Sequence, residues 1–198
     1  SGDMMYRIEK VLNHNTVIAI HQDDHKEVLI MGKGVGFGRK VAERIEVRPE
    51  DRLYSLQKYK ERGGAKEIVK SIAPEFLELT NAVLDEAEKV FGKIDRMVLF
   101  PLADHIAFAV KRIQNHEQIS NPLTEDIRVL FHMEFKAAES IRPLLKKQFQ
   151  IDIEDDEIGY VALHIHSAIE DEKVSQAMQM ARSVRECISM VEEAIGQP

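Results

Sequence analysis

The sequence has a single cysteine, Cys187, among its 198 residues, so no disulfide can form within the chain. This scarcity agrees with a reducing compartment. The cysteine lies among Val184, Ile188 and Val191 at helical spacing, which predicts a buried structural thiol. The chain also lacks any run of eighteen apolar residues, and its first residues lack the apolar core of a signal peptide. We therefore expect a cytoplasmic protein without membrane insertion.

Patterns typical of catalysis and metal binding are missing as well. No serine or cysteine stands in the context of a nucleophile elbow, and the order Asp104-His105 is the reverse of that in His-Asp phosphohydrolases. His164 and His166 stand two residues apart in a segment that has the pattern of a helix, on which they would point in different directions. We expect no enzyme, no metal site and no cofactor.

Positive charge is not in excess over the whole chain, but its distribution is uneven. The formal net charge is −7, from 27 Lys and Arg against 34 Asp and Glu. Residues 1–57 carry nine of each kind, so the entire excess of acid lies in residues 58–198. Residues 33–40 hold three cations and no acid. Any polyanionic partner is therefore expected to bind the N-terminal part.

The acid-free segment is also rich in glycine. Residues 31–40 read Met-Gly-Lys-Gly-Val-Gly-Phe-Gly-Arg-Lys, which matches neither a P-loop nor a dinucleotide-binding fingerprint. A glycine-rich hairpin loop with solvated charges is one interpretation. The other is a bare cationic backbone that approaches a polyanion closely, with Phe37 stacking on an unpaired base. The residue pattern leaves both open.

The first part of the chain predicts a small antiparallel sheet. Short β-branched runs at residues 6–12, 16–21 and 26–31 are separated by turn-forming residues, and residues 44–47 and 52–54 give one or two more strands. A sheet of this size has a thin core and an open edge, which favours association into a homodimer. Asn13 and Asn15 fall at the end of the first hairpin, where their amides either satisfy the local backbone or bind base edges.

After the Gly63-Gly64 pair the apolar period becomes that of helices. Stripes predict helices over residues 76–90, 102–113, 123–130, 131–149, 154–169 and 174–195, and Pro143 is expected to kink or interrupt the fourth. The fold class is thus multidomain, a small antiparallel β-sheet domain followed by an all-α helical bundle. Residues 83–92 resemble residues 187–196 in their apolar positions and final glycine, as in a repeated helical unit.

Two histidines stand beside apolar stripes of the helical part. His105 lies one turn before Ala109, and His164 lies between Val161 and Ala168. Each is expected at the edge of a core, where neighbouring groups define the reactivity of the imidazole. Position alone leaves a structural role and a chemical role open.

Four segments together resemble the transcriptional antiterminators of the BglG/SacY type, and most closely their glucose-regulated branch. They are Lys-Val-Leu-Asn-His-Asn at residues 10–15, Met-Gly-Lys-Gly-Val-Gly-Phe at 31–37, Leu-Ala-Asp-His-Ile-Ala-Phe at 102–108, and Glu-Ile-Gly-Tyr-Val-Ala-Leu-His-Ile-His at 157–166. The resemblance implies a co-antiterminator RNA-binding domain at residues 4–57 and a phosphotransferase-system (PTS) regulation domain at 65–172. Residues 173–198 would be a linker and the first helix of an incomplete second regulation domain.

The resemblance also implies a function and its residues. In this family a dimer of the RNA-binding domain binds a hairpin in the leader mRNA and prevents formation of the overlapping terminator. PTS proteins, namely a sugar permease component and the phosphocarrier protein, phosphorylate histidines of the regulation domains. The implied RNA-contacting residues are Asn13, Asn15, Gly32, Lys33, Gly34 and Phe37, with Arg39 and Lys40 on phosphates. His105 and His164 match the phosphoacceptors, whereas His14 stands where relatives often have asparagine.

A competing interpretation is a protein-interaction or DNA-binding regulator whose histidines are structural. A helix-turn-helix protein needs a basic recognition helix, yet every helix expected after residue 65 lies in the acidic part of the chain. RNA is therefore the expected nucleic-acid partner.

Overall fold

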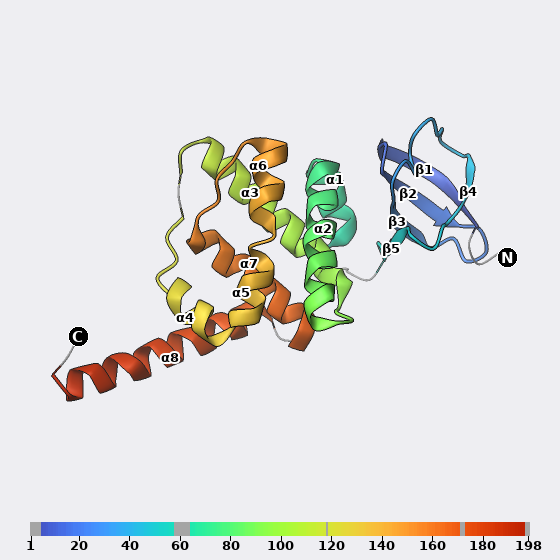
Figure 1. The fold of residues 1–198 in the computed structure, drawn as a ribbon. Helices are drawn as coiled ribbons and strands as arrows, with labels where there is room; N and C mark the ends of the chain where they lie inside the picture. Colours follow the sequence, from blue (N-terminus) through green and yellow to red (C-terminus); the bar gives the residue numbers. More distant parts are fainter. Residues whose placement is uncertain (1–4, 58–63, 118, 171–172, 197–198) are drawn as a thin grey trace. The chain divides into compact units, whose positions relative to one another are not determined.

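The computed structural model describes residues 5–57, 64–117, 119–170 and 173–196 of the chain (Figure 1). The chain divides into two compact units, Ser1–Glu78 and Leu79–Pro198. The first contains a sheet of five strands, and the second is helical. The predicted fold class is thus confirmed. Residue 4, Gly63 and residues 171–172, which stand at predicted domain boundaries, lie outside the described residues, so those boundaries stay predictions.

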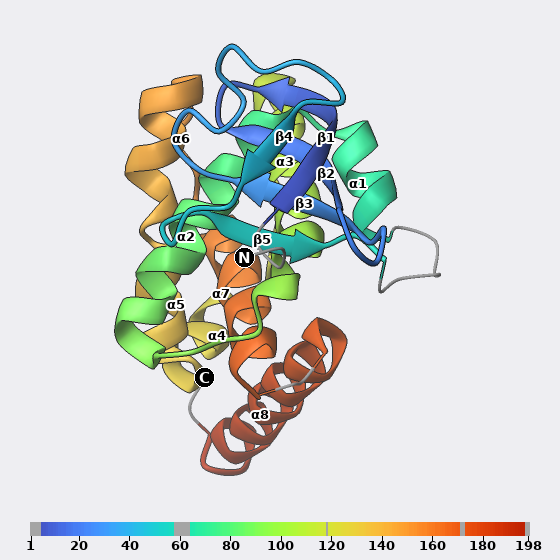
Figure 2. The ribbon, with the colours of Figure 1, turned by 90° about the vertical axis from the view of Figure 1, so that its right-hand side faces the viewer.

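The sheet consists of β1 (Met5–Asn13), β2 (Thr16–His21), β3 (Glu27–Met31), β4 (Arg44–Glu46) and β5 (Arg52–Ser55). Their order across the sheet is β4-β1-β2-β3-β5, and each neighbouring pair is antiparallel (Figure 2). Every predicted strand is present, with ends that differ by at most one residue from the expected ones. The β-branched runs account for this agreement, because such side chains pack well on a pleated surface.

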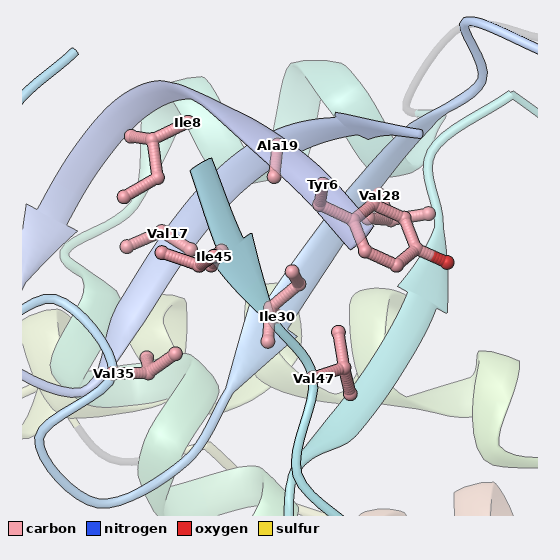
Figure 3. Close-up of a cluster of buried hydrophobic side chains, with 9 residues drawn as sticks. All are labelled: Tyr6, Ile8, Val17, Ala19, Val28, Ile30, Val35, Ile45 and Val47. Carbon is pink, nitrogen blue, oxygen red and sulfur yellow. The ribbon is translucent and has the colours of Figure 1, made fainter. Parts of the chain in front are cut away.

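One face of the sheet carries the core of the first unit. Val17 lies opposite Ile30 across the β2–β3 ladder, and both are fully buried. The cluster shown in Figure 3 consists of Tyr6, Ile8, Val17, Ala19, Val28, Ile30, Val35, Ile45 and Val47. Val35 comes from the glycine-rich segment after β3. That segment is therefore anchored at its midpoint in the core of the sheet.

The helices are α1 (Ala65–Ser71), α2 (Pro74–Phe91), α3 (Leu99–Gln114), α4 (Thr124–Leu130), α5 (His132–Ala138), α6 (Ile141–Phe149), α7 (Asp155–Glu170) and α8 (Val174–Ala194), with a 3-10 turn η2 (Arg96–Val98) before α3. In the second unit, α7 contacts η2, α3, α4, α5 and α8. More than half of its residues are buried, because apolar side chains occur on nearly all of its sides. Among the described helices, none has both the length and the apolar character needed to cross a lipid bilayer.

The fourth predicted helix, over residues 131–149, is in fact two helices. α5 ends at Ala138 and α6 begins at Ile141, so the break precedes Pro143 instead of falling on it. Proline is tolerated in the first turn of α6 because N–H groups there have no partner within the helix. The carbonyl that a residue at 143 would otherwise bond belongs to Glu139, at the break itself.

The last helix, α8, packs through its N-terminal half. Its buried residues are Ala177 and Ala181, and Figure 1 shows its second half running clear of the other helices of its unit. Cys187 is exposed, so the prediction of a buried thiol is wrong. The apolar stripe around it is real, but the described residues do not cover it, since Ile188 is 41% and Val191 55% exposed.

Candidate RNA interface and histidine pair

The glycine-rich segment after β3 folds as three successive tight turns. The N–H groups of Val35, Phe37 and Arg39 donate to the carbonyl three residues earlier, at 3.1, 3.0 and 3.2 Å. Gly34 and Gly38 have φ angles of +73° and +67°, which residues with a side chain rarely adopt. The alternate glycines therefore allow a repeated turn while Val35 stays in the core.

Two other glycines stand where the backbone passes close to its neighbours. A Cβ at Gly32 would lie 1.9 Å from Oδ1 of Asp51, and a Cβ at Gly36 would lie 2.2 Å from the carbonyl oxygen of Asn13. The N–H of Gly36 donates to the carbonyl of His14 at 2.8 Å. Close packing without side chains therefore joins the glycine-rich segment to the hairpin turn after β1.

We expect Gly36→Ala to destabilise the N-terminal unit by about 3 kcal/mol, because its methyl group would meet a backbone carbonyl that cannot rotate away. Urea unfolding measures this loss. Gly34→Ala is the matched control: the space beside Gly34 is open and only its positive φ opposes a side chain, so a loss of about 1 kcal/mol is expected. Equal losses in the two variants would contradict the close approach at Gly36.

The turn between β1 and β2 orients two asparagine side chains. Oδ1 of Asn13 accepts the N–H of Asn15 at 3.0 Å, and Oδ1 of Asn15 accepts the N–H of Gly34 at 2.8 Å. Because each oxygen is engaged with the backbone, each Nδ2 group is left as a donor that points away from the turn. Within the N-terminal unit these two donors meet the carboxylate of Glu78, at 2.7 and 2.8 Å. The oxygens thus satisfy the local backbone, and the nitrogens bind an acceptor.

Exposed aromatic and cationic side chains stand in the same two segments as these amides. Phe37 is 67% exposed, and the imidazole of His14 packs edge-on against it with ring centres 5.0 Å apart. Lys33 and Lys40 are exposed, while Arg39 forms a surface ion pair with Glu43 at 3.4 Å. The predicted RNA contacts, Asn13, Asn15, Gly32, Lys33, Gly34, Phe37, Arg39 and Lys40, therefore all belong to two segments that hydrogen bonds join.

Two residues outside the predicted set hold the glycine-rich segment in place. Nη2 of Arg48 donates to the carbonyl of Lys33 and to Oδ1 of Asp51, each at 2.8 Å. Asp51 is 8% exposed and also lies directly against Gly32. No local motif signals this support, because the Arg48 side chain reaches a carbonyl fifteen residues away.

The second predicted site pairs histidines from α3 and α7. The ring centres of His105 and His164 are 5.4 Å apart, and the ring of Tyr160 lies 5.6 Å from that of His105. One carboxylate of α7 joins this site to α3. Oε2 of Glu157 lies 3.2 Å from Nε2 of His105, and its Oε1 lies 2.8 Å from Nη2 of Arg112. The packing of α3 against α7 therefore assembles two histidines, an acid and a cation.

Burial and charge set the protonation of this site. Burial opposes the charge of Glu157, which is 1% exposed, but the hydrogen bond and charge of His105 and the charge of Arg112 keep its pKa below the usual value. Burial, with a smaller contribution from His105, lowers the pKa of His164 to about 3. His164 is therefore neutral at physiological pH, and a neutral imidazole keeps a nitrogen lone pair for nucleophilic attack.

His166 belongs to different surroundings from those of His164. Its Nδ1 lies 2.8 Å from Oε2 of Glu134, and its ring packs on Phe131 with centres 4.2 Å apart. Across the part of the chain that the structure describes, no three His, Cys, Asp or Glu side chains are placed to hold a metal ion.

Comparison with known proteins matches both parts of the chain. The family model described as CAT RNA binding domain matches residues 6–63, and the one described as PRD domain matches residues 78–168. A crystal structure described as GlcT CAT-PRDI has a TM-score of 0.71 at 30% identity, and the match covers 84% of this chain and 99% of that one. The chain belongs to the BglG/SacY family of transcriptional antiterminators.

Two relatives from staphylococci match the chain over most of its length. The GlcA/glcB genes antiterminator of Staphylococcus carnosus is 34% identical, with 84% of this chain aligned, and Protein GlcT of Staphylococcus epidermidis is 27% identical, with 94% aligned. The chain spans 58% and 66% of their lengths. These antiterminators are regulators and not enzymes, and the CAT domain is an RNA-binding domain, which favours RNA over the DNA alternative.

Proposed function

We propose that the chain is the RNA-binding and first regulatory part of a cytoplasmic antiterminator that binds a leader-mRNA hairpin and prevents terminator formation. The proposal rests on one observation: two segments that were predicted separately to bind RNA are held together in the structure. The turn at residues 13–15 is hydrogen-bonded to the glycine-rich segment, and the exposed ring of Phe37 packs against His14 of that turn. In this proposal residues 4–57 bind RNA, residues 65–172 regulate, and residues 173–198 lead into a second regulation domain.

Each part of this surface suits an RNA with unpaired bases. The Nδ2 groups of Asn13 and Asn15 are donors, so they match acceptor atoms on base edges. The exposed ring of Phe37 offers a stacking face, and exposed Lys33 and Lys40 supply charge for phosphates. Contacts with phosphates would position the hairpin, and hydrogen bonds from the amides to base edges would make the binding specific for sequence.

A homodimer would double this surface. The sheet ends in two short edge strands, β4 with three residues and β5 with four. Small sheets with open edges gain stability from association. In the dimer, two copies of the Asn13–Asn15 turn and of the glycine-rich segment would meet one hairpin.

The histidine pair is the proposed control point. PTS proteins, a sugar permease component and the phosphocarrier protein, would phosphorylate His105 and His164, and each phosphate would add close to two negative charges. The twofold relation of a dimer can bring such charges near their own copies, so repulsion and the cost of desolvation would reorganise the helical interface. The dimer, and with it the RNA-binding sheet, would then rearrange. Peptide mass mapping after incubation with those PTS proteins tests this half, and phosphate on neither histidine would refute it.

Phe37→Ala is expected to weaken hairpin binding by about 1–3 kcal/mol, or roughly 5- to 150-fold, because stacking on one base is lost. A hairpin selected from an RNA pool with randomised internal loops serves as the probe, and fluorescence anisotropy measures its affinity. Phe108→Ala is the matched control, since Phe108 is 62% exposed but lies on α3 in the helical unit. Unchanged affinity in the Phe37 variant would show that the surface is misassigned.

The selected RNA is also compared with a DNA duplex of the same sequence at matched salt. Attraction to phosphates is common to both, so a preference for RNA isolates the recognition of unpaired bases. Equal affinity for the duplex would overturn RNA recognition by this surface.

A further inference from the structure

The buried carboxylate of Glu157 lies directly against one nitrogen of the His105 ring. Oε2 lies 3.2 Å from Nε2 of His105, and only 1% of the residue is exposed. An ionised carboxylate can only accept hydrogen bonds. The nitrogen of His105 that faces it therefore carries a hydrogen, and Glu157 selects one tautomer of the neutral ring.

The other ring nitrogen of His105 is then the one with a free lone pair. Nδ1 makes no hydrogen bond with the described residues, and 23% of the side chain is exposed. Resting on the proposed function of His105 as a phosphoacceptor, we infer that Glu157 is a positioning residue that directs phosphorylation to Nδ1. A histidine without such a partner has two nitrogens that compete for the phosphoryl group.

The transfer balances without an additional acid or base. The donor is an N-phosphorylated histidine of a partner protein, whose second ring nitrogen is protonated. The Nδ1 lone pair of His105 attacks phosphorus, the donor P–N bond breaks, and the electron pair of that bond returns to the donor ring, which leaves as neutral imidazole. His105 becomes an Nδ1-phosphorylated imidazolium whose Nε2–H still donates to Glu157. The carboxylate therefore neutralises the positive charge that the ring acquires.

His164 supplies a comparison within the same site. Its ring lies beside that of His105, but the nitrogens of its imidazole make no hydrogen bond with the described residues. No carboxylate fixes which of its nitrogens carries the proton. Selectivity for one nitrogen is therefore expected at His105 and not at His164.

The first test needs neither a partner protein nor a variant of Glu157. Nitrogen-15 labelling of the histidines in the unmodified chain reports by NMR which ring nitrogen is protonated, and His105→Gln assigns the signal. We expect the proton of neutral His105 on Nε2. A proton on Nδ1 would overturn the inference, because that nitrogen could not then accept the phosphoryl group.

The second test uses phosphoramidate, a small P–N donor that requires no protein recognition. Peptides containing His105 are analysed for the Nδ1 and Nε2 phosphohistidine isomers by phosphorus NMR. In the parent chain we expect an excess of the Nδ1 isomer of about tenfold or more. A hydrogen bond from Nε2–H to a charged acceptor favours that tautomer by enough to give such a ratio. In Glu157→Gln the excess should fall, because an amide can either donate to Nε2 or accept from it. Predominant Nε2 isomer in the parent, or no reaction at His105 while other histidines react, would overturn the inference.

The two proposals fail in different ways. If phosphoramidate yields the Nδ1 isomer at His105 while PTS proteins transfer nothing, Glu157 positions the ring as inferred and the proposed regulation is wrong. If PTS proteins do phosphorylate His105, but on Nε2, the regulation stands and the role of Glu157 falls. Circular dichroism of Glu157→Gln establishes that the variant is folded before its isomers are compared.

Discussion

Asn15→Asp is expected to weaken hairpin binding by about 3 kcal/mol or more, at least roughly 150-fold, with little change in the shape of the turn. The retained side-chain oxygen can still accept the N–H of Gly34, as Oδ1 of Asn15 does at 2.8 Å. What changes is the outward group, from an amide that donates to a carboxylate that accepts. The variant loses one hydrogen bond to RNA and places a negative charge against phosphates. Fluorescence anisotropy with the selected hairpin measures the effect.

A change in total charge alone must be separated from this effect. Asn115→Asp adds the same charge on an exposed residue at the end of α3, in the helical unit, and is expected to bind RNA nearly as the parent does. Urea unfolding of both variants is needed because Asn15 lies beside the carboxylate of Glu78 in the N-terminal unit. If Asn15→Asp is as stable as the parent and binds equally well, the asparagine donors do not face the RNA.

The architecture could be predicted from the sequence to a large extent, for simple physical reasons. Alternation of β-branched residues placed every strand within one residue at each end, and apolar stripes located the main helices. The burial of individual side chains was harder to predict, because it depends on whether another element covers them. The stripe around Cys187 has the spacing of a packed helix, but periodicity does not say whether anything covers it, and the thiol is exposed.

The sequence predicted which segments form the candidate site, but it did not predict the contacts between their side chains. The motifs indicated Asn13, Asn15 and Phe37. The structure adds that both amide oxygens accept backbone N–H groups, so that the nitrogens are left as donors, which here bind the carboxylate of Glu78. Glu157 opens one of the family-like motifs, yet its role depends on the packing of α3 against α7, which brings it to His105. Such long-range pairs follow from tertiary packing and leave no spacing signal in a single sequence.

Removing the carboxylate of Glu157 should have the largest effect on stability. We expect Glu157→Ala to destabilise the helical unit by about 3–5 kcal/mol, because the guanidinium of Arg112 would remain as a buried charge without its partner. Arg112 is already poorly compensated, since its Nε and Nη1 are buried and make no hydrogen bond with the described residues. Urea unfolding followed by far-ultraviolet circular dichroism, which is dominated by helices, measures the loss.

The double variant Glu157→Met with Arg112→Met tests this explanation. It removes both charges and keeps apolar volume, so most of the lost stability should return. The pH dependence supplies a second check. The pKa of Glu157 is lowered in the folded chain, so its contribution is complete above the ordinary carboxyl pKa and disappears as the pH falls through the lowered value. The stability difference between parent and Glu157→Ala should therefore shrink at acid pH, and a difference that stayed constant would show that lost packing, and not charge, is the cause.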